Sequence, residues 1–539
     1  MGHGLCPTRV AVGMAALMLT GSVIAAQERV DDGMNWRIRQ EAATTSQVLR
    51  TVHTLTDRYG PRLTGSPNLE AAGRWAIQQM EAWGLTNGRM EGFDFGHPGW
   101  SNERLSVHVV APVMDALVVE ALAWTPGTNG TIRAEVVTLL PPESATRETL
   151  DSYLDGVRDG VRGKVVLVGA HTTVGVSLNG AASRREDADL EREFNAPPPQ
   201  PIGPGGGAGR GGGSDAPDRP LSAGEIEARV AAFLREAGAA ARVNDAGRVH
   251  GQIQAFHNRT FDIDAVVPTV VMRNEDYGRI SRLLRFGTDP VELELDIVNR
   301  EHPDGVTAYN AIAELPGTDL ADEVVMLGGH LDSWHAATGA TDNAVGVAVM
   351  MEAARILASL EVQPRRTIRV ALWGGEEQGL LGSKAYVERH FGTAENPTAA
   401  YDTFAGYFNI DAGTGRARGA QVFGPPEAGE ILDAVFAPFR DLGVIGARTT
   451  TSRRSGESDH TSFNAAGLPG ISMQQDPIQY FSYTWHSNLD TYERVLEQDA
   501  IASSISVAAA VYHLAMRDEQ LPRFTPRDMP PSLTPPPGR

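Results

Sequence analysis

Histidines and acidic residues recur just after short apolar segments in the second half of the chain. Imidazole nitrogens and carboxylate oxygens together form a mixed ligand set that suits Zn²⁺. The candidate ligands are His330, Asp342, Glu377, Asp411 and His486. This set is too large for one closed tetrahedral site, but a shared carboxylate makes two three-ligand sites with room for water or hydroxide between them. The pattern indicates hydrolysis at a pair of metal ions.

Two further acidic residues lie beside these ligands. Glu376 precedes Glu377 and is free to act as a general base, which takes a proton from the attacking water and returns it to the leaving amine. Asp332 follows closely after His330, so on an extended strand the two side chains face the same way and Asp332 can orient the imidazole. Each residue alone is more often a solvated surface group, and only the complete set favours the metal interpretation.

The elements that must position these residues are predicted from the apolar segments that precede them. These segments have the length and composition of buried strands, and a helical pattern begins at residue 343. Ligands of open α/β sheets bind beyond the carboxyl ends of the strands. The sequence therefore predicts an α/β fold whose functional edge follows the segments 323–327, 367–373, 406–410 and 470–474.

Length and composition divide the chain into parts. A chain of 539 residues exceeds one ordinary domain. Residues 118–296 contain short strand-like segments that no histidine and carboxylate set follows, so they are predicted to form a β-rich domain inserted between 27–117 and 297–521. Within the insertion, 196–220 is dominated by proline and glycine and is expected to be a flexible loop. Residues 522–539 form a proline-rich tail.

The first 26 residues have the pattern of a secretory signal. Arg9 precedes an apolar segment, 10–26, that has no charged residue and ends in small residues suited to cleavage. We therefore expect export to a periplasm or to the extracellular space. Cys6 is the only cysteine, so the cleaved chain would have neither disulfides nor thiol chemistry.

The charge balance bears on possible partners. The net charge is −20, from 67 acidic against 47 basic residues. Such a surface disfavours binding to nucleic acid or to an anionic membrane. No segment after the signal is apolar enough to predict a membrane span.

In combination, these motifs resemble the M28 family of zinc-dependent exopeptidases, and most closely its plasma glutamate carboxypeptidase (carboxypeptidase Q) branch. The insertion is similar to a protease-associated domain at 163–169 and 268–284. The likeness covers nearly all of the chain after the signal, except the 196–220 loop and the tail. It rests on the segments 59–70, 329–334, 341–343, 372–379, 409–413 and 486–491.

The resemblance implies a mixed, largely parallel sheet flanked by helices and two Zn²⁺ ions per chain. It implies hydrolysis of short peptides by a metal-bridged hydroxide, with Glu376 as the base and Asp332 orienting a ligand histidine. The peptide bond after Asp342 would be cis. The implied ligand roles are Asp342 as the bridge, His330 and Asp411 for one metal, and Glu377 and His486 for the other.

Two features depart from the pattern of the closest branch. His335 stands where that branch often has an acidic residue. Residues 458–463 are more similar to general M28 aminopeptidases, and His460 within them is a candidate substrate contact. Aminopeptidase, dipeptidase and carboxypeptidase activities therefore remain alternatives.

Two functions of other classes are also compatible with such a fold. The first is a non-catalytic binding or receptor protein, for which missing metal ligands would be the sign. The second is a glutaminyl cyclase-like acyltransferase, which would be expected to use a single zinc. The resemblance also suggests a homodimer.

Overall fold

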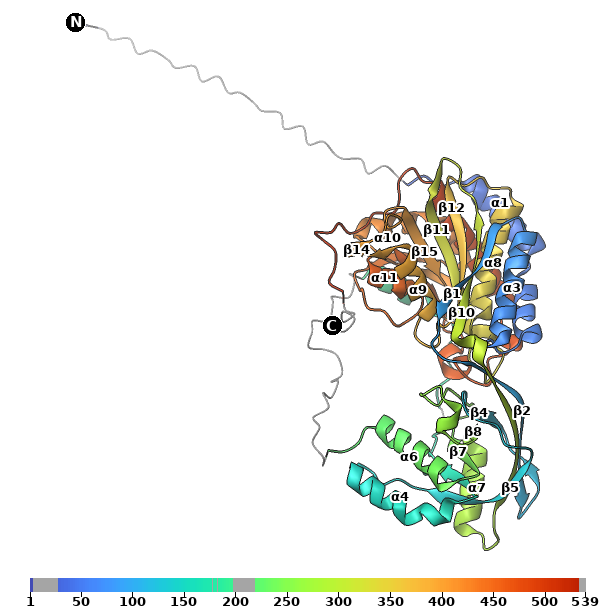
Figure 1. Cartoon of the computed structure of the whole chain (residues 1–539). Helices are drawn as coiled ribbons and strands as arrows, with labels where there is room; N and C mark the ends of the chain where they lie inside the picture. Colours follow the sequence, from blue (N-terminus) through green and yellow to red (C-terminus); the bar gives the residue numbers. More distant parts are fainter. Residues whose placement is uncertain (3–27, 177, 182, 197–218, 533–539) are drawn as a thin grey trace.

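The computed structural model describes residues 1–2, 28–176, 178–181, 183–196 and 219–532. The predicted signal segment 1–26 and the loop 196–220 lie almost wholly outside these residues, and the tail is described up to residue 532. The chain forms two bodies, each built on an eight-stranded sheet. Figure 1 shows one body above the other, with β2 leading into the lower one.

The sheet of the first body is mixed. Its central strands β12, β11, β15 and β18 pair in parallel, and so do β16 and β17. The pairs β1–β10, β10–β12 and β16–β18 are antiparallel. The prediction of a mixed, largely parallel sheet is confirmed. In order across the sheet, the strands are β1 (Thr86–Asp94), β10 (Thr307–Leu315), β12 (Arg366–Trp373), β11 (Leu320–His330), β15 (Phe404–Asn409), β18 (Gly470–Gln475), β16 (Ala417–Phe423) and β17 (Gly446–Thr450).

Helices cover both faces of this sheet. One apolar core lies under the helices α1 (Asp32–Thr45), α2 (Val48–His53), α3 (Pro67–Ala82), α8 (Val345–Ser359), α10 (Pro426–Phe436) and α12 (Glu497–Met516). A second core lies on the other face, under α9 (Leu381–His390) and α11 (His460–Ala466). A two-stranded ribbon, β13 (Gly392–Thr393) and β14 (Asn396–Pro397), follows α9.

The helices α8 and α12 are apolar around most of their circumference because they pack against each other and against the sheet. Burial of each large aliphatic side chain stabilises such a core by about 1.5–3 kcal/mol. Among the described helices, α12 alone has the length and composition of a membrane span, but 89% of its apolar window is buried. Core packing therefore accounts for its apolar character.

The second body has its own mixed sheet, and helices α4 (Arg147–Val161), α6 (Ala223–Ala237) and α7 (Asn274–Phe286) belong to it. Its helical content is therefore larger than the sequence pattern indicated. In sheet order, its strands are β3 (Asp115–Ala116), β2 (Gly99–Ala111), β9 (Glu292–His302), β5 (Ile132–Leu139), β6 (Val165–Val168), β7 (Ala241–Asp245), β8 (Thr269–Met272) and β4 (Val119–Ala121).

The pairing of β2 with β9 extends from Gly99 to His302, beyond the predicted limits 118 and 296 of the insertion. One helix from within those limits, α5 (Asp187–Phe194), lies against the first body. Arg448 of that body covers the ring of Phe194 at 5.7 Å.

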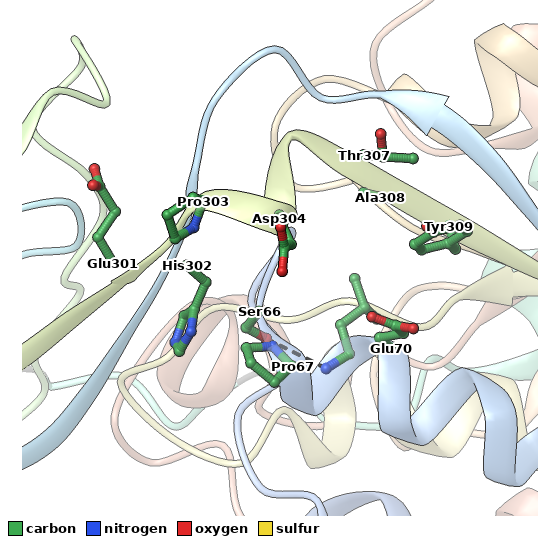
Figure 2. Close-up of a pocket in the computed structure, with 13 residues that line it drawn as sticks. Ser66, Pro67, Glu70, Glu301, His302, Pro303, Asp304, Thr307, Ala308 and Tyr309 are labelled. Carbon is green, nitrogen blue, oxygen red and sulfur yellow. Dashed lines mark hydrogen bonds between the residues drawn. The ribbon is translucent and has the colours of Figure 1, made fainter.

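Three glycines, Gly65, Gly99 and Gly305, lie close together where the chain passes between the two bodies. The turn after β9 lies opposite the start of α3, as Figure 2 shows for Asp304 and Ser66. A cavity of about 230 Å³ lies at this junction. A Cβ atom on Gly99 would lie 1.9 Å from the carbonyl oxygen of Gly65, and one on Gly305 would lie 2.3 Å from the same oxygen. Only residues without side chains allow so close an approach.

Arg62 holds the loop that leads from β11 to α8. Its side chain is fully buried, and burial lowers the pKa of the guanidinium to about 10, so it stays charged at neutral pH. It donates hydrogen bonds of 2.7–3.1 Å to carbonyl oxygens in this loop and in the segment before Arg62. The acceptors are Leu55, Gly60, Leu331, Thr338 and Gly339.

Replacing Arg62 by methionine leaves these carbonyl groups without donors in a buried place. We expect Arg62→Met to lower the free energy of unfolding of the first body by about 3 kcal/mol or more, measured by urea denaturation with tryptophan fluorescence. Arg74→Met is the control, because Arg74 forms an exposed ion pair with Glu70 on one helix and should change little. Equal stability of the two variants would contradict the role of Arg62.

Candidate metal centre

The carboxylate of Asp342 lies between two histidines, and each of its oxygens faces one of them. Oδ1 is 3.2 Å from Nε2 of His330, and Oδ2 is 3.3 Å from Nε2 of His486. A further carboxylate lies beside each histidine: Asp411 Oδ1 is 3.2 Å from His330 Nε2, and Glu377 Oε2 is 2.9 Å from His486 Nε2. The structure thus brings the five predicted ligands into two triplets that share Asp342.

Neighbouring strand ends create this arrangement. His330 ends β11, while Glu377 and Asp411 follow β12 and β15, which flank β11 in parallel. The carboxyl ends of parallel strands meet at one edge of the sheet, where the loops converge. Asp342 lies in the short turn Ala340–Ala344 at the entrance of α8, and the peptide bond between Asp342 and Asn343 is cis, as the resemblance implied.

His486 reaches the centre from a loop rather than from a strand end. The loop follows β18 and the short helix Tyr480–Thr484. His486 has a φ of 56°, in the left-handed region that non-glycine residues seldom adopt. Its ring stacks on Trp485 at a centroid distance of 4.0 Å.

Buried atoms without hydrogen-bond partners test whether the residues fit a cation. Within the described residues, Oδ2 of Asp342 and Oε1 of Glu377 are buried and have no such partner. Buried polar atoms nearly always have one. Burial raises the pKa of Glu377 well above its usual range, and the neighbouring charge of Asp342 raises it further. A pair of divalent cations would satisfy the oxygens and offset the excess of negative charge, so the residues fit metal ions with nitrogen and oxygen ligands.

Asp332 acts on more than the histidine that the sequence paired with it. Nδ1 of His330 lies 3.0 Å from the backbone oxygen of Asp332 but 3.7 Å from its carboxylate Oδ1. The carboxylate instead accepts hydrogen bonds of 3.2 Å from the amides of Glu376 and Glu377, and one of 3.1 Å from the hydroxyl of Thr64. Asp332 therefore contacts the ring through its backbone and holds the two glutamates through its side chain.

Asp490 supports the shared carboxylate, although the sequence analysis did not single it out for the site. Its two oxygens accept hydrogen bonds from the amides of Thr341, at 2.6 Å, and Asp342, at 3.0 Å. Ser458 also supports the site and donates a hydrogen bond of 2.6 Å to Oδ2 of Asp411. Both lie in motifs that the sequence brought out, but nothing in the motifs identified their partners.

The centre opens into a cavity of about 640 Å³. Glu376 lines it, and burial raises the pKa of this carboxyl well above its usual range, with Asp411 adding to the increase. His460, the predicted substrate contact, also lines the cavity, and its Nδ1 has no hydrogen-bond partner among the described residues. Burial lowers the pKa of His460 to about 4, so the imidazole is neutral at neutral pH.

His335, which departs from the family pattern, does not line this cavity. Its Nε2 lies 2.7 Å from the carbonyl oxygen of Ala121 in the second body, and its ring meets Trp100 edge to face. Burial lowers the pKa of His335 to about 4. The residue thus joins the two bodies as a neutral side chain.

Comparison with known proteins agrees with this geometry. Residues 310–512 match the model of peptidase family M28. Carboxypeptidase Q of Rattus norvegicus is 27% identical over 87% of this chain and 85% of its own length. The human carboxypeptidase Q is 26% identical over the same shares. Leupeptin-inactivating enzyme 1 of Streptomyces exfoliatus is 31% identical over 39% of this chain and 49% of its own length.

Solved structures share the fold. A peptidase M28 precursor from Shewanella amazonensis superposes with a TM-score of 0.61 at 24% identity, over 92% of this chain and 100% of its own. BSAP, a zinc aminopeptidase from Bacillus subtilis, superposes with a TM-score of 0.53 at 17% identity, over 90% of this chain and 98% of its own. The match of residues 310–512 to peptidase family M28 and the similarity to carboxypeptidase Q over 87% of the chain together identify a peptidase-like domain with a candidate metal centre.

Proposed function

We propose that this chain is an exported exopeptidase that binds two Zn²⁺ ions and hydrolyses short peptides with free ends. The observation that carries the proposal is the carboxylate of Asp342, whose two oxygens face different imidazoles, each with a further carboxylate beside it. Zinc is the metal named for BSAP, and the nitrogen and oxygen ligand set suits it. Export rests on the sequence of residues 1–26.

The residues divide into ligands and a base. We assign Asp342 as the shared ligand, His330 and Asp411 to one site, and Glu377 and His486 to the other. When bound, zinc polarises the scissile carbonyl and lowers the pKa of water. Glu376 takes the proton of the attacking water and returns it to the leaving amine, and the Asp332 carboxylate fixes its backbone.

The cavity chemistry favours a short substrate with both ends free. The carboxylates of Glu376 and Asp411 line the cavity, and an acidic lining attracts a free amino group. Lys384 is the one lysine or arginine that lines this cavity in the described part of the chain, and it suits a free carboxylate. His460 offers a neutral imidazole to the backbone between the two ends.

Three further predictions from the sequence remain proposals. They are the cleaved signal peptide, the assignment of the insertion as a protease-associated-like domain, and the homodimer. The two alternative classes are less well supported. A receptor would be expected to lack ligands, whereas all five come together, and a cyclase would need only one of the two triplets.

The shared and the unshared ligands should differ in their effect on metal content. Asp342→Asn weakens both sites, whereas Glu377→Gln weakens only the site that contains His486, so the second variant should keep about one zinc per chain. The measurement is zinc content by mass spectrometry after dialysis against buffered free zinc. Full zinc content in Asp342→Asn would contradict the shared ligand.

The base should matter for turnover but not for metal binding. Glu376→Gln keeps the shape of the side chain but cannot accept the proton, so we expect kcat to fall about 10²–10⁴-fold with near-normal zinc content. Glu457→Gln, at another acidic residue lining the same cavity, serves as the control. Activity near that of the wild type would show that Glu376 is not the base.

Blocking either end of the substrate tests the preference for free ends. One short peptide is assayed in three forms, free, N-acetylated and C-amidated, with zinc and with a chelator. We expect chelator-sensitive cleavage of the free form and loss with both blocked forms. Loss with only the acetylated form indicates an aminopeptidase, and loss with only the amidated form a carboxypeptidase. Absence of any cleavage by zinc-loaded protein would refute the peptidase proposal.

A further inference from the structure

The two histidines of the metal centre are held in different ways. His330 ends a central strand of the first body, and its Nδ1 lies 3.0 Å from a carbonyl oxygen. His486 lies in a loop, and its Nδ1 has no hydrogen-bond partner within the described residues. Metal-binding histidines are usually oriented by a partner at the second ring nitrogen. His486 therefore depends on whatever fixes its loop.

Residues 251–253 of the second body support this loop by hydrogen bonds to Asn488, which lies in the loop two residues after His486. The amide of Ile253 donates a hydrogen bond of 2.8 Å to Oδ1 of Asn488, and the amide of Asn488 donates one of 3.0 Å to the carbonyl of Ile253. Nδ2 of Asn488 donates a third, of 3.2 Å, to the carbonyl of Gly251. One asparagine thus pairs with the backbone of residues 251–253 in the manner of a strand neighbour.

Further contacts extend this pairing to the ring itself. The side chain of Gln254 donates a hydrogen bond of 2.9 Å to the carbonyl of Trp485, the residue before His486. Phe256 meets the imidazole of His486 edge to face at 5.6 Å and meets Trp334 of the β11 loop at 5.1 Å. Residues 251–256 therefore contact the loop that carries the histidine at several points.

The segment 251–256, which we call the anchor, is buried at two positions that pack against the first body. Ile253 and Ala255 are fully buried, and they form a small apolar cluster with Ala336, which belongs to the loop after β11. The segment is therefore fixed to the first body by apolar packing as well as by hydrogen bonds.

We propose that Asn488 is a positioning residue for one of the two metal sites, and that the second body thereby supports the site of Asp342, Glu377 and His486 but not the site of His330. This inference rests on the proposed two-zinc centre. It gives the insertion a role in building the centre. Loss of the anchor should weaken one zinc and leave the other in place.

The test is equilibrium dialysis of the full chain against buffered free zinc, fitted to two sites. We expect Asn488→Leu to weaken one site by about 10–100-fold and to leave the other unchanged. Asn488→Asp keeps the acceptor for the Ile253 amide and should lose less. Asn299→Leu is the matched control, because Asn299 also bonds backbone carbonyls of the second body but lies away from the centre. It should bind both ions normally.

A double variant identifies the affected site. In Glu377→Gln, which lacks the site in question, adding Asn488→Leu should not change the affinity for the remaining zinc. Equal weakening of both sites, or no weakening, overturns the inference. If Asn488→Leu does not fold, Gln254→Ala, which removes only the bond to Trp485, carries the same test. Wild-type protein that binds a single zinc instead refutes the two-zinc centre itself.

Discussion

The structure depends on the placement of one buried carboxylate, that of Asp342, between two imidazoles. Around it lie three further carboxylates, those of Glu376, Glu377 and Asp411, all lining one cavity. Like charges 4 Å apart repel by about 4 kcal/mol at an effective dielectric constant near 20. So dense an acidic cluster is stable only with compensating positive charge, and burial lowers the pKa of one of the two neighbouring histidines, His486. Hydrogen bonds fix Asp342 in this place, since Asp490 accepts one from its amide and Arg62 donates two to carbonyls of the loop before it.

The two bodies contribute unequally to the centre. The first body provides all five candidate ligands, through three neighbouring strand ends, the turn before α8 and one long loop. The second body provides none of them, but residues 251–256 lie against the loop of His486 and His335 is bonded to Ala121. Where the chain passes between the bodies, Gly65, Gly99 and Gly305 bring their backbones into close contact.

Sequence patterns were sufficient for the parts that follow simple periodicity. Each apolar segment ahead of a candidate ligand is a strand of the first sheet, and the residues expected to bind metal come together at its edge. The residues that support the site could not be predicted from the sequence, because their hydrogen-bond partners are backbone groups remote in the sequence. Arg62 bonds the carbonyls of Thr338 and Gly339, and Asn488 bonds Gly251 and Ile253. No spacing rule connects such positions, and only the fold identifies them.

Zinc-edge anomalous diffraction from crystals of the zinc-loaded protein tests the central claim most directly. We expect two peaks, about 3.5–4 Å apart, one on each side of the Asp342 carboxylate. One peak should lie beside His330 and Asp411, and the other beside Glu377 and His486. A single peak, or two peaks that do not share Asp342, would contradict the account.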